Sequence, residues 1–235
     1  MSTRRLGILG GTFDPIHRGH LDLGRAAQAA LDLTEVLVVP ANIPPHRPQP
    51  FASSYHRFAM TALAVAGLEG WRASDLELRA GAQSFTTDTL KGLHQQGHPV
   101  SALFFVIGAD AFAEIEGWKD SPGILDRAHF AVVPRPSFAV EALPRLLPRL
   151  AGRMARRPFE APAQLCPMIF LIDAPTSDVS STAIRRRRAA GESIEGLVPP
   201  AVRQHIEQHG LYTSTVPDPG ALDAQGAPAA DRLHG

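Results

Sequence analysis

The chain has 235 residues, of which 44% are hydrophobic and 20% charged, and its formal net charge is +0. This length and apolar content fit a globular protein with a sizeable core, and the balanced charge gives no overall basic field that would favour nucleic acid. Cys166 is the only cysteine, which excludes an intrachain disulfide and a cysteine-built metal cage and suits a reducing cytoplasm. No apolar run approaches the roughly 20 residues of a membrane span, and the four apolar residues after Arg5 are too few for a signal-peptide core. We therefore expect a cytoplasmic protein that binds neither nucleic acid nor membrane.

Short apolar runs alternate with helical patterns along most of the chain. The expected strands are Leu6–Leu9, Glu35–Pro40, Trp71–Leu78, Ala102–Ile107, Ala128–Val133 and Met168–Ile172. The expected helices are Arg18–Leu31, a segment capped by Ser53 or Ser54 that ends near Ala66, and Thr86–Gln96. This alternation favours an α/β fold, a Rossmann-like doubly wound parallel sheet covered by helices on both faces.

Two segments differ in composition from the rest. Residues 136–167 are rich in proline, arginine and alanine, and we expect a peripheral insertion with some helix there, not a second domain. Residues 213–235 are rich in proline, glycine and alanine and hold too little apolar surface to offset their ordering entropy, so they are expected to form a disordered tail. One domain over residues 1–212, with a small helical part at its C-terminal end, is the expected organisation.

The stretch GGTFDPIHRGHL (Gly10–Leu21) follows the first expected strand. Ligands bind beyond the carboxyl ends of parallel strands, and Gly10 and Gly11 would let one approach the backbone closely. His17 and His20 would share one face at the start of a helix, where exposed N–H groups and the helix dipole favour anions. The pattern favours a polyphosphate site. An ordinary glycine turn, solvated histidines and a zinc site remain alternatives, although two histidines are too few ligands for zinc.

A second polar pattern, VSSTAIR (Val179–Arg185), occurs late in the chain. The hydroxyls of Ser180–Thr182 can cap a helix and donate to phosphate oxygens, and Arg185 can neutralise phosphate charge. Simple helix capping also accounts for the hydroxyls. Four consecutive helical residues point in different directions, so of Arg185–Arg188 we expect only Arg185 to face phosphates. A basic patch for nucleic acid is the minor alternative.

Several other residues have both a binding and a structural interpretation. Asp110 follows a buried strand and Gly108, so it lies at the carboxyl edge or caps the next helix. Trp118 offers a stacking face or fills the core, and Thr86 meets an anion through its N–H or caps its helix. His46 is a loop histidine with no assigned partner.

His17-Arg18-Gly19-His20 resembles the H-x-G-H hallmark of a superfamily of nucleotidyltransferases that includes adenylyl- and cytidylyltransferases, and SSTAIR resembles its second hallmark. Further segments are similar to the bacterial nicotinate-nucleotide adenylyltransferase family. They are PPHR (Pro44–Arg47), ELRAGAQSFTTDTL, FVIGADAFAEIEGWKD and LVPPAVRQHIEQHGLY (Leu197–Tyr212). Arg47, Phe85 and His205 stand where that family usually has lysine, tyrosine and tyrosine. The resemblance covers residues 4–212 apart from 136–167.

The resemblance implies adenylyl transfer from ATP to nicotinate mononucleotide, giving nicotinate adenine dinucleotide and pyrophosphate in NAD biosynthesis. Mg²⁺ would accompany ATP, held mainly by phosphates and water and not by a protein metal site. The alternatives are an adenylyl- or cytidylyltransferase that acts on another phosphate acceptor, such as phosphopantetheine, and a non-catalytic nucleotide- or RNA-binding protein.

The resemblance also implies roles for individual residues. The implied catalytic residues are His17, His20 and Arg185. The implied ATP-binding residues are Gly10, Gly11, Thr12, Phe13, His17, His20, Ser180, Ser181, Thr182 and Arg185. The implied mononucleotide-binding residues are Asp14, His46, Arg47, Phe85, Thr86, Gly108, Asp110 and Trp118. N–H groups near Phe85 and Thr86 would favour the acid mononucleotide over its amide.

Overall fold

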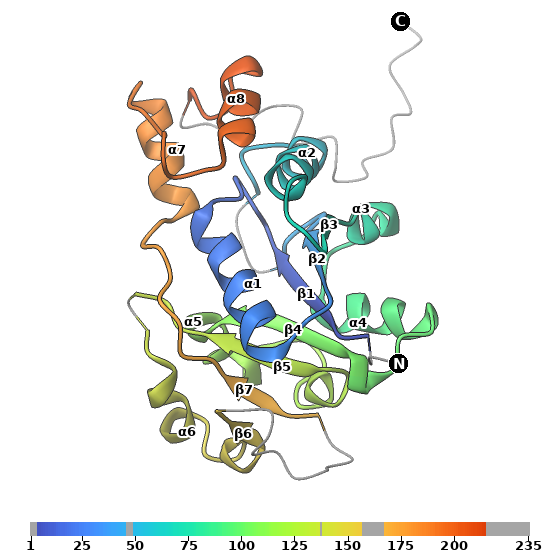
Figure 1. Ribbon diagram of the computed structural model, residues 1–235. Coiled ribbons are helices and arrows are strands. Elements are labelled where there is room, and N and C mark those ends of the chain that lie inside the picture. Colours follow the sequence, from blue (N-terminus) through green and yellow to red (C-terminus); the bar gives the residue numbers. More distant parts are fainter. Residues whose placement is uncertain (1–3, 46–48, 137, 157–166, 215–235) are drawn as a thin grey trace, which may run out of the picture.

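A computed structural model describes residues 4–45, 49–136, 138–156 and 167–214 (Figure 1). Its centre is a seven-stranded parallel sheet with strand order β3-β2-β1-β4-β5-β7-β6. The strands are β1 Leu6–Gly11, β2 Glu35–Pro40, β3 Trp71–Ala73, β4 Leu103–Gly108, β5 His129–Val133, β6 Met154–Ala155 and β7 Ile169–Leu171. The chain builds outward from β1 to β3, returns to β4 and builds outward again. The strand order therefore reverses between β1 and β4, and the expected doubly wound, Rossmann-like sheet is confirmed.

Helices cover both faces of this sheet. The helices are α1 Arg18–Leu31, α2 Ser54–Val65, α3 Leu76–Ala80, α4 Thr86–Gln95, α5 Ala109–Phe112, α6 Leu143–Leu146, α7 Ser181–Ala189 and α8 Pro200–Gln208. Shorter 3-10 turns occur at Val100–Ala102, Ile115–Gly117, Gly123–Asp126, Val140–Ala142 and Ala151–Arg153. One apolar core joins one sheet face to α1, α2, α7 and α8, and a second core joins the other face to α4, α5 and α6.

Strand β4 shows how the sequence produces two cores. Phe104 and Val106 are buried in the first core, whereas Leu103, Phe105 and Ile107 are buried in the second. Successive side chains of a strand point to opposite faces, so a strand covered on both sides must be apolar at every position. This requirement explains the unbroken apolar run that predicted the strand.

Two expected element boundaries differ from the structure by more than one residue. The strand expected over Trp71–Leu78 ends at Ala73, and α3 follows, because Ser74 starts a turn in which its Oγ accepts a hydrogen bond from Leu76 N at 3.3 Å. The first strand, expected to end at Leu9, continues through Gly10 and Gly11, which pair with β2. The two glycines are therefore the last residues of the strand and not part of the turn.

The described part of residues 136–167 lies at one edge of the sheet. Its β6 pairs with β7, and Val140, Leu143, Leu147 and Leu150 are buried in the second core. The tail expected over residues 213–235 lies outside the described residues, except for its first two. No helix in the described ranges is long and apolar enough to cross a membrane.

Asp14 connects three distant parts of the chain. Its buried carboxylate accepts hydrogen bonds from Phe51 N at 2.7 Å, Ala52 N at 3.1 Å and the Tyr212 hydroxyl at 2.8 Å. Burial, followed by the charge of Asp14, raises the pKa of Tyr212, so its hydroxyl stays a protonated donor. The last described residues thus hold the loop that follows β1.

The substitution Tyr212→Phe should lower the free energy of unfolding by about 1.5–3 kcal/mol, because it removes one buried hydrogen bond to a charged group. Urea denaturation measures the change. Tyr55→Phe is the matched control, since Tyr55 is 79% exposed and its substitution should change stability by less than about 0.5 kcal/mol. Equal effects of the two substitutions would contradict the bracing role of Tyr212.

Arg57 makes a similar connection from within α2. It is 1% exposed and donates to the carbonyl oxygens of Thr12, Ala41, Asn42 and Ala52, at 2.8, 2.5, 2.8 and 3.2 Å. Those carbonyls belong to the segments after β1 and β2 and to the approach to α2. One guanidinium therefore satisfies backbone acceptors that would otherwise be buried without partners.

Candidate active site

The glycine pair at the end of β1 makes room for aromatic neighbours. A Cβ on Gly11 would lie 2.7 Å from the ring of Phe13, and a Cβ on Gly10 would lie 3.4 Å from the ring of Phe105. Phe13 is 1% exposed and has a φ of 51°, so the chain turns sharply and folds this ring back under the strand. The glycines thus have a packing role in addition to the close ligand approach expected from the sequence.

The H-x-G-H stretch forms a compact start to α1. His17 is the N-cap residue, and its N–H donates to His20 Nδ1 at 3.2 Å. The two rings are stacked, with centroids 3.7 Å apart. Because Nδ1 of His20 accepts this bond, the proton of the neutral ring lies on Nε2. A Cβ on Gly19 would lie 3.2 Å from the His17 ring, which explains a glycine at this position.

His17 is held neutral by its surroundings. It is 2% exposed, and within the described part of the chain its Nδ1 has no hydrogen-bond partner. Burial, followed by the charge of Arg135, lowers its pKa from 6.5 to about 3, while Asp22 acts in the opposite direction. At neutral pH this ring is therefore an uncharged, buried polar group.

This low pKa predicts an acid-sensitive fold. The unfolded chain protonates His17 below about pH 6.5 while the folded chain does not, so this group should lower stability by about 1.4 kcal/mol per pH unit as the pH falls. A His17→Gln variant lacks this effect. Between pH 6.5 and 4.5 its stability relative to the wild type should therefore rise by about 2–3 kcal/mol in denaturant titrations. Parallel pH profiles for the two proteins would contradict the buried neutral state.

The second motif lies directly against the first. Ser181 Oγ donates to Pro15 O at 2.9 Å, and Arg185 Nη1 donates to Asp14 O at 2.6 Å. The Arg185 guanidinium also lies 4.7 Å from the centre of the Phe51 ring. Contacts between positions 171 residues apart therefore bring SSTAIR to the loop that carries the histidines.

The other hydroxyls of this motif are engaged locally. Ser180 is the N-cap of α7 and accepts from Ala183 N at 3.1 Å, and Thr182 Oγ1 accepts from Arg185 Nη2 at 3.3 Å.

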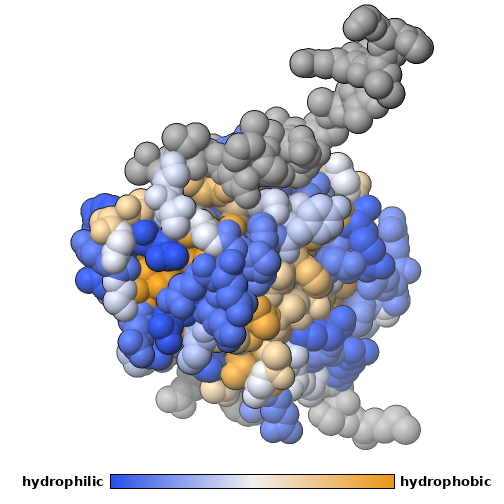
Figure 2. All heavy atoms as spheres, turned by 90° about the horizontal axis from the view of Figure 1, so that it is seen from above, coloured by the Kyte–Doolittle hydropathy of each residue, from blue (hydrophilic) through white to orange (hydrophobic). Residues whose placement is uncertain are grey.

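Helices α7, α8 and α2 lie at the top of Figure 1, and the face seen from above mixes hydrophilic and apolar side chains (Figure 2).

Gly108 is the last residue of β4 and Asp110 follows it in α5, and a cation that the sequence did not indicate lies beside them. Arg135 follows β5, and its Nε lies 4.0 Å from Asp110 Oδ1. A Cβ on Gly108 would lie 2.6 Å from that oxygen and 3.0 Å from that nitrogen, so only glycine leaves space for both. Arg135 also acts on the His17 pKa, which places its charge near the histidines. The only signal for Arg135 in the sequence was its position two residues after the buried strand β5.

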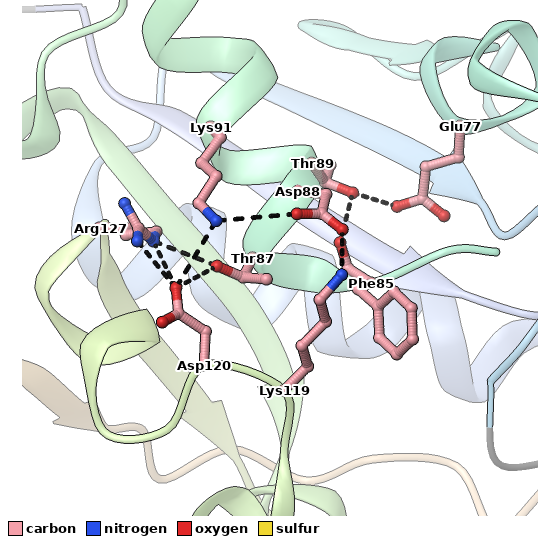
Figure 3. Close-up of polar contacts among 9 residues, drawn as sticks. All are labelled: Glu77, Phe85, Thr87, Asp88, Thr89, Lys91, Lys119, Asp120 and Arg127. Atoms are coloured by element: carbon pink, nitrogen blue, oxygen red, sulfur yellow. Dashed lines mark hydrogen bonds and ion pairs between the residues drawn. The ribbon is translucent and has the colours of Figure 1, made fainter. Parts of the chain in front are cut away.

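The two aromatic residues expected at the mononucleotide have different neighbours. Trp118 meets Phe105 edge to face, with centroids 6.4 Å apart, and Phe105 is the ring that faces Gly10. Phe85 is the N-cap residue of α4, so Thr86 is the first residue of that helix. The Lys119 ammonium lies 4.0 Å above the Phe85 ring (Figure 3).

Some expected site residues are bound elsewhere or are not described. The Asp14 carboxylate already accepts hydrogen bonds from the three donors given above. Its expected contact with the mononucleotide therefore stays a prediction. His46 and Arg47 lie outside the described residues. Just before them, Asn42 N donates to Ser84 Oγ at 2.8 Å, so the loop after β2 is anchored beside the start of α4.

The fold and the two adjoining motifs are those of a nucleotide-transferring enzyme, and residues 8–187 match the cytidylyltransferase-like family, to which the chain belongs. Its relatives narrow the class. A probable nicotinate-nucleotide adenylyltransferase of Cronobacter sakazakii is 40% identical over 86% of this chain and 93% of its own length. The protein of the same name from Escherichia coli O139:H28 is 38% identical over 87% of this chain and 97% of its own length. The structure of Plasmodium falciparum nicotinic acid mononucleotide adenylyltransferase complexed with NaAD is similar in fold, with a TM-score of 0.68, 20% identity and coverage of 89% of this chain and 98% of that one.

Proposed function

We propose that this protein transfers the adenylyl group of ATP to nicotinate mononucleotide, releasing pyrophosphate and forming nicotinate adenine dinucleotide, a reaction of NAD biosynthesis. The observation that carries the proposal is the contact of Ser181 and Arg185 with the Asp14-Pro15 loop. This contact joins Arg185 to the loop that precedes His17 and His20, and a cation there suits an enzyme that handles a triphosphate. Family membership and the named relatives support the same reaction.

The chemistry needs alignment and neutralisation of charge. A phosphate oxygen of the mononucleotide attacks the α-phosphorus of ATP, the bond to the bridging oxygen breaks, and pyrophosphate leaves in line. No protein nucleophile takes part. Nε2–H of His20 and the guanidinium of Arg185 donate to phosphate oxygens as charge builds on the leaving group. Neutral His17 orders the start of α1 through the bond of its N–H to His20.

Mg²⁺ enters this scheme with the triphosphate and supplies additional neutralisation of phosphate charge. Among the described residues no group of three His, Cys, Asp or Glu side chains is arranged to hold a metal ion. Phosphate oxygens and water would hold the ion, which is the usual coordination of Mg²⁺ with nucleotides.

The expected mononucleotide side of the site is suited to a ring that carries a carboxylate. Phe85 and Trp118 offer apolar ring surfaces, and the N–H of Thr86 opens α4. Nearby carboxylates would oppose an acid substrate, but Asp88 is paired with Lys119 at 2.8 Å and Asp110 lies 4.0 Å from Arg135. We therefore propose that nicotinate mononucleotide is preferred over nicotinamide mononucleotide.

Mass analysis of products tests the proposal. The purified protein is incubated with Mg²⁺ and ATP or CTP, together with nicotinate mononucleotide, nicotinamide mononucleotide or phosphopantetheine in separate reactions. The expected result is nicotinate adenine dinucleotide and pyrophosphate from ATP, with the highest kcat/KM for the acid mononucleotide. Product from phosphopantetheine or from CTP alone would assign a different transferase, and nucleotide binding without pyrophosphate release would assign a binding protein.

A further inference from the structure

Residues 172–180 connect β7 to α7, so this connecting segment leads directly into the SSTAIR motif. Figure 1 shows it running alongside α1, the helix that begins at the two histidines. Its course brings Ser177 to Asp22, which lies two residues after His20 in α1. The connecting segment therefore reaches from one motif of the site to the other, and its contact with α1 can fix how the two motifs lie relative to each other.

Asp22 holds the connecting segment through one carboxylate oxygen. Its Oδ2 accepts hydrogen bonds from Ser177 N at 3.0 Å and from Ser177 Oγ at 2.6 Å. Hydrogen bonds to an ionised acceptor are shorter and stronger than those between neutral groups. The Asp22 side chain is 23% exposed, so water has limited access to it. Two charge-assisted hydrogen bonds thus tie a residue of the connecting segment to the helix of the histidines.

Gly19, the glycine between the two histidines, allows this close approach. A Cβ on Gly19 would lie 3.2 Å from Ser177 O, in addition to its contact with the His17 ring. Gly19 and Asp22 are three residues apart in α1, so they share one face of the helix. Gly19 therefore leaves space for the backbone of the connecting segment, and Asp22 binds that backbone in place.

Two other anchors hold the connecting segment and the start of α7 to different elements. Thr176 Oγ1 donates to Pro134 O at 3.1 Å, and Ser181 Oγ donates to Pro15 O at 2.9 Å. Pro134 follows β5 and Pro15 lies before α1, whereas the bonds at Ser177 reach α1 itself. The Asp22 contact is thus the anchor that joins the connecting segment to the helix.

We propose that Asp22 is a positioning residue for ATP, which rests on the proposed adenylyl transfer. By fixing Ser177 against α1, it sets the place of Ser180, the N-cap of α7, three residues later. The place of α7 in turn sets where the Arg185 guanidinium meets the loop before His17. Transfer to phosphorus depends on such alignment, and a misplacement of about 1 Å can cost about 10²-fold in rate.

The effect should be selective for ATP. The motifs that Asp22 aligns are those expected to bind the triphosphate, whereas Phe85 and Trp118, expected at the mononucleotide, belong to other elements. Loss of the Asp22 contact should therefore weaken ATP and leave the mononucleotide almost unaffected. A residue that only stabilises the fold would not separate the two substrates.

Two charged residues of α1 and its C-cap provide matched controls. Arg25→Met removes the other partner of Asp22, since Arg25 Nη1 lies 3.7 Å from Asp22 Oδ1, but leaves both bonds to Ser177. Asp32→Asn removes an equal charge from the C-cap residue of α1, whose side chain is 84% exposed. A general effect of negative charge near α1 would appear in both aspartate variants, whereas a specific contact involves Asp22 alone.

The experiment measures kcat, KM for ATP, KM for nicotinate mononucleotide and the dissociation constant of ATP in D22A, D22N, S177A, D22A/S177A, R25M, D32N and the wild type. D22A should raise KM and the dissociation constant for ATP by about tenfold and change KM for the mononucleotide by less than about twofold. S177A keeps the backbone donor and should raise KM for ATP about threefold. D22N keeps an acceptor oxygen and should recover most of the loss. The double variant should resemble D22A, because both substitutions remove one contact, and R25M and D32N should stay within about twofold of the wild type.

Several outcomes would overturn the inference. KM for ATP could stay unchanged in a folded D22A protein whose melting temperature falls, as expected for a purely structural anchor. KM could rise equally for both substrates, D32N or R25M could match D22A, or the losses in the double variant could simply add. If D22A does not fold, S177A decides, and an unchanged KM for ATP in that variant would also overturn the inference.

The same measurements separate this inference from the proposed function. A wild-type protein that forms no dinucleotide and releases no pyrophosphate would overturn the proposed function and this inference with it. An active wild type whose KM for ATP is unaffected by both D22A and S177A would overturn the inference alone.

Discussion

His20→Ala should lower kcat by about 10²–10³-fold and change the affinity for ATP by only a few-fold. Nδ1 of His20 accepts from His17 N, so its N–H donor lies on Nε2 at the start of α1, after the loop that Arg185 contacts at Asp14. A donor in this position acts most strongly on charge that develops as pyrophosphate leaves. Loss of that donor therefore affects the transition state more than the bound substrate.

Steady-state kinetics and ATP titration separate the two effects. Ala also removes the acceptor for His17 N, which should cost about 1 kcal/mol of stability, so the melting temperature of each variant is measured beside its rate. His20→Asn keeps an amide N–H and should recover part of the lost rate. Near-normal kcat in a folded His20→Ala protein would remove His20 from the reaction.

Arg57→Met should lower the free energy of unfolding by about 3–5 kcal/mol. The substitution keeps much of the apolar stem but leaves three buried carbonyl oxygens and one part-buried carbonyl oxygen without their donor. It also removes the positive charge that acts on buried Asp14. Because Thr12 O is one of the four acceptors, the end of β1 should loosen, and activity should fall even where the protein stays folded.

Denaturant titration and activity at low temperature test this second prediction. Arg57→Lys should lie between the wild type and Arg57→Met, because an ammonium cannot reproduce the planar fork of donors. Arg186→Met is the control, since Arg186 is exposed on α7 and its loss should change stability by less than about 0.5 kcal/mol. A loss below about 1 kcal/mol for Arg57→Met would show that the four bonds contribute little.

The sequence predicted the sheet and most helices because apolar runs and helical periods are local properties. Glu35–Pro40 and Arg18–Leu31 occur with the expected bounds. The prediction of a strand over Trp71–Leu78 was wrong because Leu76 and Leu78 suit a strand or a helix equally well. The turn at Ser74 decides between the two. Short apolar runs do not distinguish strand from helix without such flanking information.

The candidate site was predictable where it rests on a contiguous motif. The two hallmark motifs were found, and the structure brings them together. The partners of these motifs were not found. Arg135 was missed because its contact with Asp110 joins residues that are distant in the chain, and its place shortly after a buried strand was the only local signal. Arg57 resembles any charged residue of an amphipathic helix until the fold buries it.

The hydrogen bond between Tyr212 and Asp14 has a consequence for folding during synthesis. A ribosome releases Asp14 early, but the hydroxyl that completes its hydrogen bonding is 198 positions later. The nascent chain can pair its first strands during synthesis, whereas the loop beside the histidines reaches its final form only when the closing helix and Tyr212 have emerged. A chain whose translation stops before Tyr212 should therefore form the sheet but lack the hydrogen bond that holds the loop after β1. Catalytic activity should appear only when synthesis is complete.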